Sequence, residues 1–316
     1  VIVVVILVDY EILAKISPVI YGLSLISLVA VLFTEPINGA TSWFNIGRRQ
    51  RQMCIRDRIA VVLFMANVMV KLQQKGREEI NRFCKLGIIL ATVAVPTLLI
   101  IKQPDYGTAL AFLVALIFML YVAGINKKYI ITAVLLVVIL VPLAYFFILP
   151  EHAKARIDVY LNPNLDPRGD GYNIIQSKLA IGAGQIFGMG LFKGNQTQLG
   201  YLYPKTTDFI FAVISEEMGF VVAGAIIVLY VILITKSIQV AKTAKDDLGS
   251  YIATGIVGIF FFHMLENIGM TMGLLPITGI PLPFVSYGGS SMLTNLTLIA
   301  ILLNISTRRK KAMFIE

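Results

Sequence analysis

The stretch Phe209–Thr235 reads FIFAVISEEMGFVVAGAIIVLYVILIT and indicates the class of the fold. A helix needs roughly 20 apolar residues to cross the hydrocarbon core of a bilayer, and this stretch is long enough despite two charged side chains, Glu216 and Glu217. Similar apolar runs recur along the chain, which predicts an all-α polytopic membrane protein. The nine runs are Val1–Val8, Ile16–Phe33, Ile59–Val70, Leu86–Ile101, Thr108–Gly124, Tyr129–Leu149, Phe209–Thr235, Tyr251–Leu274 and Phe284–Leu303.

The composition supports a membrane protein and excludes an ordinary soluble one. Only 14% of the 316 residues are charged and 57% are hydrophobic, whereas about a quarter of the residues in soluble chains are charged. The 27 basic and 18 acidic residues leave a net charge of +9. Because the basic residues are scattered between apolar runs, nucleic acid is not an expected partner. The two cysteines and two histidines show no ligand spacing, so no metal site built from them is expected.

The placement of charge predicts the topology. Short cytoplasmic loops are rich in Lys and Arg. Because successive spans place loops alternately on the two sides of the membrane, all but one of the short basic loops lie on the same side as the basic C-terminus, which we expect to be cytoplasmic. The long polar stretch 150–207 then lies outside, so we expect a single integral membrane domain, 1–316, with one large extracellular loop. The first run is too short to span, and we expect it to be the end of a helix that starts before residue 1. The cytoplasmic basic segments are 71–85, 127–128, 236–245 and 308–311.

Ionisable groups inside the predicted spans are candidate functional residues, because a charge in the bilayer core is costly. Glu216 and Glu217 lie about eight residues, or roughly 12 Å of helix, from the outer end of their run. They indicate either a polar cavity that opens outward or a tilted lead-in segment that does not span. His263, Glu266 and Asn267 share one helix face, and we interpret them as interhelical hydrogen-bonding groups rather than as reacting groups.

Two glycine-rich stretches interrupt the apolar pattern. The run Ala180–Gly190 reads AIGAGQIFGMG, but no strand or βαβ unit precedes it, so a dinucleotide site is not expected. It indicates instead a close approach of the backbone to a ligand or to the membrane. The stretch Gly273–Ser291 gathers prolines, glycines and hydroxyls between two apolar runs. Irregular backbone at membrane depth needs protein or a watery cavity around it, so we expect the lip of a cavity here.

Small residues predict a packing surface on the span after the glutamates. Gly219 and Ala223 are one helical turn apart, and Gly224 lies beside them. Small residues at this spacing allow a second helix to approach closely. The second helix belongs either to a partner protein or to this chain.

Four motifs resemble the SEDS family (shape, elongation, division and sporulation) of bacterial peptidoglycan polymerases, and the resemblance covers nearly the whole chain. Within the family, the loop Gly194–Gly200 (GNQTQLG) is more similar to the RodA branch, which acts in elongation, than to the FtsW branch, which acts in division. The four motifs are Asn38–Gly47 (NGATSWFNIG), Pro104–Thr108 (PDYGT), Thr207–Gly219 (TDFIFAVISEEMG) and the stretch Gly273–Ser291.

The resemblance implies a bundle of ten transmembrane helices, about nine of them represented here, in the bacterial cytoplasmic (inner) membrane. It implies a peptidoglycan glycosyltransferase that polymerises lipid II into glycan strands for cell elongation and rod shape. A class B penicillin-binding protein would be the crosslinking partner, and Asp208 matches the family's catalytic aspartate. Two alternatives come from other classes: a lipid II flippase, whose path buried carboxylates would line, and a non-catalytic scaffold of the synthase complex.

The implied chemistry assigns a role to Asp208. A sugar 4-hydroxyl attacks an anomeric carbon whose leaving group is a lipid pyrophosphate, and a carboxylate can take the hydroxyl proton. A helix cap is the competing interpretation of Asp208. The sequence identifies no cofactor, although Mg²⁺ or Mn²⁺ would suit a pyrophosphate. Candidate substrate-binding residues are Arg58, Lys193, Gln196, Gln198, Lys205 and Thr207. Candidate cavity or structural polar residues are Asp105, Glu216, Glu217, His263, Glu266, Asn267, Ser286 and Tyr287.

The arginine-rich segment Arg48–Arg58 departs from both the charge pattern and the family pattern. Alternation places it outside, against the bias of the other short loops. The family has a stretch like QPSExAK where this chain has QMCIRDR, so Ile55 replaces the family glutamate while Arg58 keeps the charge of the family lysine. We interpret the segment as an error in the sequence rather than as biology.

Overall fold

The computed structural model describes residues 2–33, 43–46, 49–52, 54–147, 151–162, 165–166, 169–204 and 206–309. Within these residues the regular secondary structure is helical apart from one antiparallel hairpin, β1 (Trp43–Ile46) and β2 (Arg49–Gln52). The predicted all-α class is therefore confirmed. The short hairpin is an addition that the sequence did not predict.

The nine predicted apolar runs all lie wholly or largely in helices. Among the described residues, five helices, α2, α4, α10, α11 and α12, are long and apolar enough to cross a membrane, and α5 is a shorter apolar helix. A polytopic arrangement follows from their number. The helices are α1 (Ile2–Leu7), α2 (Tyr10–Val31), α3 (Cys54–Leu72), α4 (Phe83–Ile101), α5 (Tyr106–Val122), α6 (Lys127–Phe147), α10 (Ile210–Thr243), α11 (Asp247–Thr271) and α12 (Gly289–Thr307).

The long loop between α6 and α10 is partly helical, although the sequence predicted only a polar loop. It contains α7 (Glu151–Leu161), α8 (Asp170–Ala183) and the single turn α9 (Asn195–Gln198). A short 3₁₀ helix, η1 (Arg77–Asn81), connects α3 to α4. The extracellular placement of the long loop stays a prediction.

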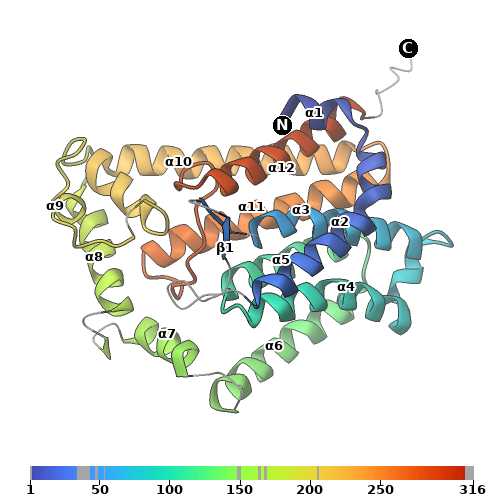
Figure 1. Ribbon diagram of the computed structural model, residues 1–316, viewed down its shortest axis with the longest axis horizontal. Helices are drawn as coiled ribbons and strands as arrows, with labels where there is room; N and C mark the ends of the chain where they lie inside the picture. The colour runs from blue at the N-terminus through green and yellow to red at the C-terminus, as the bar shows by residue number, and fades with distance from the viewer. Residues whose placement is uncertain are drawn as a thin grey trace. The chain divides into compact units, whose positions relative to one another are not determined.

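The chain divides into two compact units, and each is described by itself. The first unit comprises Val1–Ile125, Ile232–Phe262 and Gly288–Glu316, and the second comprises Asn126–Val231 and His263–Tyr287. In the first unit α2 packs along α3, α3 along α4, α4 along α5, and α1 against α12 (Figure 1). The single membrane domain stays a prediction.

Side-chain caps fix the starts of two helices in the first unit. Asp9 Oδ1 accepts a 3.0 Å hydrogen bond from Glu11 N at the start of α2. Asp105 Oδ1 accepts a 3.0 Å hydrogen bond from Thr108 N at the start of α5. Each cap satisfies one of the N–H groups that a helix start leaves unpaired, and its loss costs about 1 kcal/mol. Asp105 therefore has a structural role within its own unit.

A small apolar core anchors the start of α10 in the second unit. Buried Phe209 and Ala212 pack with Ala180 of α8 and with Leu202. Full burial of a Phe side chain contributes roughly 1.5–3 kcal/mol. The core therefore fixes the chain immediately beside the predicted catalytic position, Asp208.

Helix α10 is interrupted at Gly219. Its backbone angles there are φ 75° and ψ −175°, outside the helical region, and a residue with a side chain rarely adopts them. A first helical segment therefore ends at Met218, and a longer one begins after the break. Glu216 and Glu217 belong to the first segment. Gly219 also falls outside the continuous helix that the predicted small-residue surface requires.

The loop after α8 supplies the hydrogen bonds that the break removes. The N–H groups of Met189 and Gly190 each donate a 2.9 Å bond to the carbonyls of Glu216 and Glu217. On the other side of the break, Phe220 N donates to Gln185 O at 2.9 Å and Val221 N donates to Ile186 O at 3.2 Å. Each such bond stabilises by about 0.5–1.5 kcal/mol net, so the loop and the two helix segments form one hydrogen-bonded structure.

Glycines allow this loop to approach α10. A Cβ at Gly184 or Gly188 would overlap the backbone of Ser215 or Glu217, and a Cβ at Gly219 would overlap that of Gly188. The sequence predicted that this stretch approaches a ligand or the membrane. The structure places it against the protein's own broken helix, a contact between segments about 30 residues apart that local sequence does not reveal. An approach to a ligand or to the membrane stays a prediction.

Candidate functional site

Asp208 is half-buried and lies two residues before α10. The competing interpretation of this residue was a helix cap. The helix begins at Ile210, and the carbonyl of Phe209 accepts the first helical bond, from Val213 N at 3.2 Å. The capping position therefore belongs to Phe209.

Three successive carbonyls around Asp208 are each held by a separate donor. Tyr287 N donates to Thr206 O at 2.9 Å, and Ser286 Oγ donates to Thr207 O at 2.7 Å. Asn267 Nδ2 donates to the carbonyl of Asp208 itself at 2.9 Å. These contacts, the carbonyl clamp, fix the backbone on which the Asp208 carboxylate is carried.

The stretch Gly273–Ser291, predicted as a cavity lip, supplies most of the clamp. Ser286, which is 6% exposed, also accepts a 2.7 Å hydrogen bond from Leu282 N, so the donor to Thr207 is itself held. Gly279 lies opposite the Asp208 carboxylate, because a Cβ on Gly279 would be 3.5 Å from Oδ2. Its φ of 74° is in the region that favours glycine.

Polar side chains of α11 also form hydrogen bonds with the stretch Gly273–Ser291. His263 Nδ1 lies 3.2 Å from Pro281 O, and a carbonyl partner requires the proton on this nitrogen. Thr278 Oγ1 donates to Glu266 Oε1 at 2.8 Å, and Asn267 Nδ2 donates to Ile280 O at 2.7 Å. These side chains were predicted to bond between helices. All three bond to the irregular segment that follows their own helix, and Asn267 bonds also to the carbonyl of Asp208. All three are buried: His263, Glu266 and Asn267.

Glu216 and Glu217 bind the loop around α9. Glu216, which is fully buried, accepts hydrogen bonds from Gln196 N at 2.7 Å, Thr197 N at 3.0 Å and Thr197 Oγ1 at 2.5 Å. Glu217 Oε1 accepts from Gln198 Nε2 at 3.0 Å. A carboxylate at the N-terminus of a helical turn is favourable, so the pair orders α9 beside the start of α10 (Figure 1).

The predicted substrate-binding residues fall into three groups. Thr207 is part of the carbonyl clamp, together with Ser286 and the largely exposed Tyr287. Gln196 and Gln198 lie on α9, and Lys193 is exposed just before it. Lys205 lies outside the described residues. The remaining candidate, Arg58, belongs to the first unit.

Arg58 is almost fully buried, with 2% of its surface exposed. Its Nη2 donates to Thr108 Oγ1 at 3.3 Å, and Thr108 Oγ1 donates to Asp105 Oδ2 at 2.9 Å. A buried guanidinium needs such partners because its desolvation is costly. The structure therefore excludes a solvated loop charge at this position, and it links two residues that the sequence had not paired.

The sequence missed three contributors to the site. Gly279, Thr197 and the carbonyl of Thr206 were not singled out, because their roles depend on contacts across large sequence separations. The only sign in the sequence of the positive φ at position 279 is that the residue is a glycine. Within the described residues, no three His, Cys, Asp or Glu side chains come together as an ion-binding group.

Sequence comparison gives the family. Residues 1–311 match the profile of the cell cycle proteins FtsW, RodA and SpoVE. The chain belongs to this family. The resemblance to SEDS proteins is thus confirmed, and the family and the apolar helices together indicate a multi-pass protein of the bacterial inner membrane.

Several relatives and solved structures share nearly the whole length of this SEDS chain. It is 38% identical to the peptidoglycan glycosyltransferase MrdB of Escherichia coli K12 over 93% of this chain and 78% of the relative. It is 36% identical to the probable peptidoglycan glycosyltransferase FtsW of Trichlorobacter lovleyi over 96% and 79%. A chain in a peptidoglycan synthase complex that coordinates polymerization and crosslinking matches with a TM-score of 0.82 at 26% identity, over 98% and 86%. RodA of Thermus thermophilus shares the fold, with a TM-score of 0.70 at 23% identity, over 98% and 84%.

Proposed function

We propose that this SEDS protein is a peptidoglycan glycosyltransferase that polymerises lipid II, with Asp208 as the general base. Curated relatives named peptidoglycan glycosyltransferase support the activity. The observation that carries the assignment of the base is the carbonyl clamp, which holds three successive carbonyls ending at Asp208. A half-buried carboxylate on a fixed backbone suits proton removal, because a base must stay within hydrogen-bond reach of its proton.

The reaction needs one carboxylate. The 4-hydroxyl of one sugar attacks the anomeric carbon of the other, the hydroxyl proton passes to Asp208, and the pyrophosphate leaves with the electrons of the broken C–O bond. Direct displacement inverts the anomeric carbon, so no second carboxylate nucleophile is needed, in contrast to a retaining glycosidase. The leaving pyrophosphate needs positive charge rather than a proton. Lys193 and Lys205 are the candidate cations of the loop before Asp208.

A divalent cation is compatible with the residues present. Mg²⁺ commonly keeps several waters and binds through one or two carboxylates together with substrate phosphates. Asp208 can supply one such carboxylate, whereas the Glu216 oxygens are engaged by the turn α9. Bound there, Mg²⁺ or Mn²⁺ would neutralise charge that develops on the pyrophosphate.

The partner that this proposal implies is a class B penicillin-binding protein, which would crosslink the new strand. The structural likeness to a chain of a peptidoglycan synthase complex supports such an assembly. The identity to MrdB and the loop Gly194–Gly200 favour a role in elongation and rod shape. The flippase alternative relied on buried carboxylates lining a path, but Glu216 accepts three hydrogen bonds from the loop and Glu266 accepts one from Thr278.

Labelled lipid II separates these activities. The full-length chain is purified in detergent with its partner, and a β-lactam blocks the partner's crosslinking. A flippase gives no product in detergent, because no two sides exist, whereas a polymerase gives long uncrosslinked glycan. Asp208→Ala protein prepared in the same way excludes a contaminating polymerase. Absence of polymer from the wild-type complex would contradict the proposal.

A further inference from the structure

A groove lies between the last parts of α10 and α12 in the first unit. Its volume is about 530 Å³. The residues from each helix are spaced i, i+3, i+4, i+7 and i+10, with Gln239 at i+6 in addition on α10, which places them on one face. On α10 they are Leu233, Lys236, Ser237, Gln239, Val240 and Thr243. On α12 and just after it they are Ile299, Leu302, Leu303, Ser306 and Arg309.

The groove is apolar at one end and polar at the other. Because the single helix α11 connects α10 to α12, the two run in the same direction across the predicted membrane. Leu233 and Ile299 therefore mark the bilayer end, and Thr243 and Arg309 mark the cytoplasmic end. At 1.5 Å per residue the groove is roughly 15 Å long. Its polarity changes along this length as that of a phospholipid does, from acyl chain to headgroup.

Two cations of the groove lack ion-pair partners. Lys236 and Arg309 are exposed, and neither forms an ion pair with another residue in the part of the chain that the structure describes. Ser237 Oγ donates to Leu233 O at 2.7 Å, which leaves its oxygen lone pairs as acceptors rather than adding a countercharge. The groove therefore presents two positive charges beside an apolar floor.

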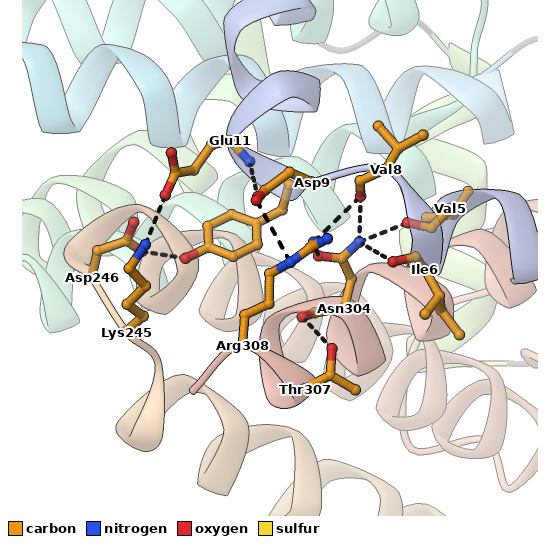
Figure 2. A network of polar contacts seen from close by, with 11 residues as sticks. Val5, Ile6, Val8, Asp9, Glu11, Lys245, Asp246, Asn304, Thr307 and Arg308 are labelled. Carbon is orange, nitrogen blue, oxygen red and sulfur yellow. Dashed lines mark hydrogen bonds and ion pairs between the residues drawn. The ribbon is translucent and has the colours of Figure 1, made fainter. Parts of the chain in front are cut away.

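Neighbouring cytoplasmic cations of the same unit behave differently. Lys245 Nζ lies 3.3 Å from Glu11 Oε1, and Arg308 Nε lies 3.5 Å from Asp9 Oδ2 (Figure 2). A hydrogen bond from Lys85 of α4 lowers the pKa of Glu79 in η1. Acidic partners are thus available on this surface, but none of the described residues that line the groove is acidic.

We propose that this groove binds one anionic phospholipid of the cytoplasmic leaflet. Its acyl chain lies along the end formed by Leu233 and Ile299, and its phosphate lies between Lys236 and Arg309. Basic pockets between transmembrane helices on this side of a membrane are suited to anionic headgroups. A covering transmembrane helix fits less well, because it would bury two cations without countercharge, at a high desolvation cost.

The test measures lipid retention by the full-length protein. Micelles containing the protein receive phosphatidylglycerol or phosphatidylcholine with matched acyl chains, and native mass spectrometry counts the retained lipid. Each cation near an anionic lipid is expected to contribute about fivefold in affinity. We expect wild type to prefer phosphatidylglycerol by about 10- to 30-fold. The double variant Lys236→Ala with Arg309→Ala should lose this preference.

A matched control removes two charges elsewhere on the cytoplasmic surface. Lys75→Ala with Lys242→Ala changes exposed lysines outside the groove and should keep the preference. An equal loss in both double variants, or no preference in wild type, would overturn the proposal. Inorganic phosphate in millimolar excess should not displace the lipid, and displacement would show that the acyl chain contributes nothing.

A labelling experiment tests whether protein covers the groove. In a background with Cys54→Ser and Cys84→Ser, Gln239→Cys should react rapidly with a maleimide in lipid-free detergent. Added phosphatidylglycerol should slow the reaction, and phosphatidylcholine should not. A cysteine that is blocked without lipid would show that a polypeptide segment occupies the groove, and it would overturn the lipid proposal.

Discussion

Two buried asparagines, Asn304 in α12 and Asn267 in α11, each donate hydrogen bonds to several backbone carbonyls. They differ in whether their own side-chain oxygen has a hydrogen-bond partner. Asn304 donates to three carbonyls at the end of α1, and its own oxygen accepts from Arg308, which pairs with Asp9 (Figure 2). Asn267 donates to two carbonyls, one of them that of Asp208. Its own oxygen has no hydrogen-bond partner among the described residues.

The difference separates a structural network from a functional one. A buried acceptor without a partner costs about 1–3 kcal/mol, and the network around Asn304 avoids this cost by adding an ion pair. Around Asn267 this cost is not avoided, because its oxygen stays without a partner in the described part of the chain while its nitrogen holds the carbonyl of Asp208. Local departures of this kind are typical of functional sites, where the surrounding structure compensates for them.

Truncating each asparagine sharpens the comparison most strongly. Asn267→Ala should lower the polymerisation rate per folded molecule by about 100-fold or more, because small misplacements of reacting groups have effects of this size. Asn304→Ala should lower the melting temperature and the yield, since it leaves three carbonyls without this donor. The folded fraction of Asn304→Ala should polymerise lipid II at close to the wild-type rate.

The two measurements are the melting temperature and the glycan yield normalised to folded protein. An Asn267→Ala protein that loses only stability would show that the carbonyl clamp has no role beyond folding. An Asn304→Ala protein with a specific loss of rate would remove the distinction between the two regions.

The break in α10 offers a second comparison, between two glycines of one helix. Gly219→Ala should destabilise the protein by more than about 3 kcal/mol, since it combines a positive φ with overlap against Gly188. A Cβ at Gly224 meets no atom within 4 Å, so Gly224→Ala should be neutral or stabilise by up to about 1 kcal/mol. Thermal unfolding of the two variants checks this. Equal stability of the two would mean that α10 is continuous.

The helical architecture was predictable because hydropathy reports length and burial directly. The run Phe209–Thr235, for example, lies almost wholly in α10. The break at Gly219 was not predictable, because the hydrogen bonds that replace the helical ones come from residues 185–190. Hairpin β1–β2 was missed as well, since its four-residue strands are too short to show a pattern.

The candidate site was only partly predictable. Motif resemblance gave Asp208, and one-face spacing brought His263, Glu266 and Asn267 together. Their targets could not be read from spacing, because the carbonyl of Asp208 lies 59 residues from Asn267 in sequence. Burial of Arg58 was also missed, because its partner Thr108 lies in a different helix. The role of a polar group depends on its partner, and most of these partners are distant in sequence.

The contact between α9 and α10 should show an intermediate effect. Glu216→Gln keeps the size of the side chain but removes the charge that three donors share. Charge-assisted hydrogen bonds are roughly twice as strong as neutral ones, so the turn α9 should loosen and activity should fall about 10-fold. Hydrogen exchange of the Gln196 and Thr197 amides should quicken. Unchanged exchange would show that the carboxylate does not order α9.

The smallest effect on this protein alone is expected at Gly224. Beside it, Phe220 and Val221 are 72% and 52% exposed, and large exposed apolar side chains suit a partner's transmembrane helix. Since a Cβ at Gly224 meets no atom within 4 Å, Gly224→Leu should leave yield unchanged but weaken co-purification with the penicillin-binding protein. A lower yield would instead indicate packing within this chain. Unchanged yield with unchanged co-purification would place the partner on another surface.

The most direct test of the central claim is the polymerisation rate of Asp208→Asn in the purified complex. The asparagine keeps the shape of the side chain, and the clamp acts on the backbone carbonyl, so folding and partner binding should be retained. Its amide cannot take a proton at neutral pH, so incorporation of labelled lipid II into glycan should fall below detection. Glycan of normal length, formed at the wild-type rate by this variant, would contradict the assignment of Asp208 as the base.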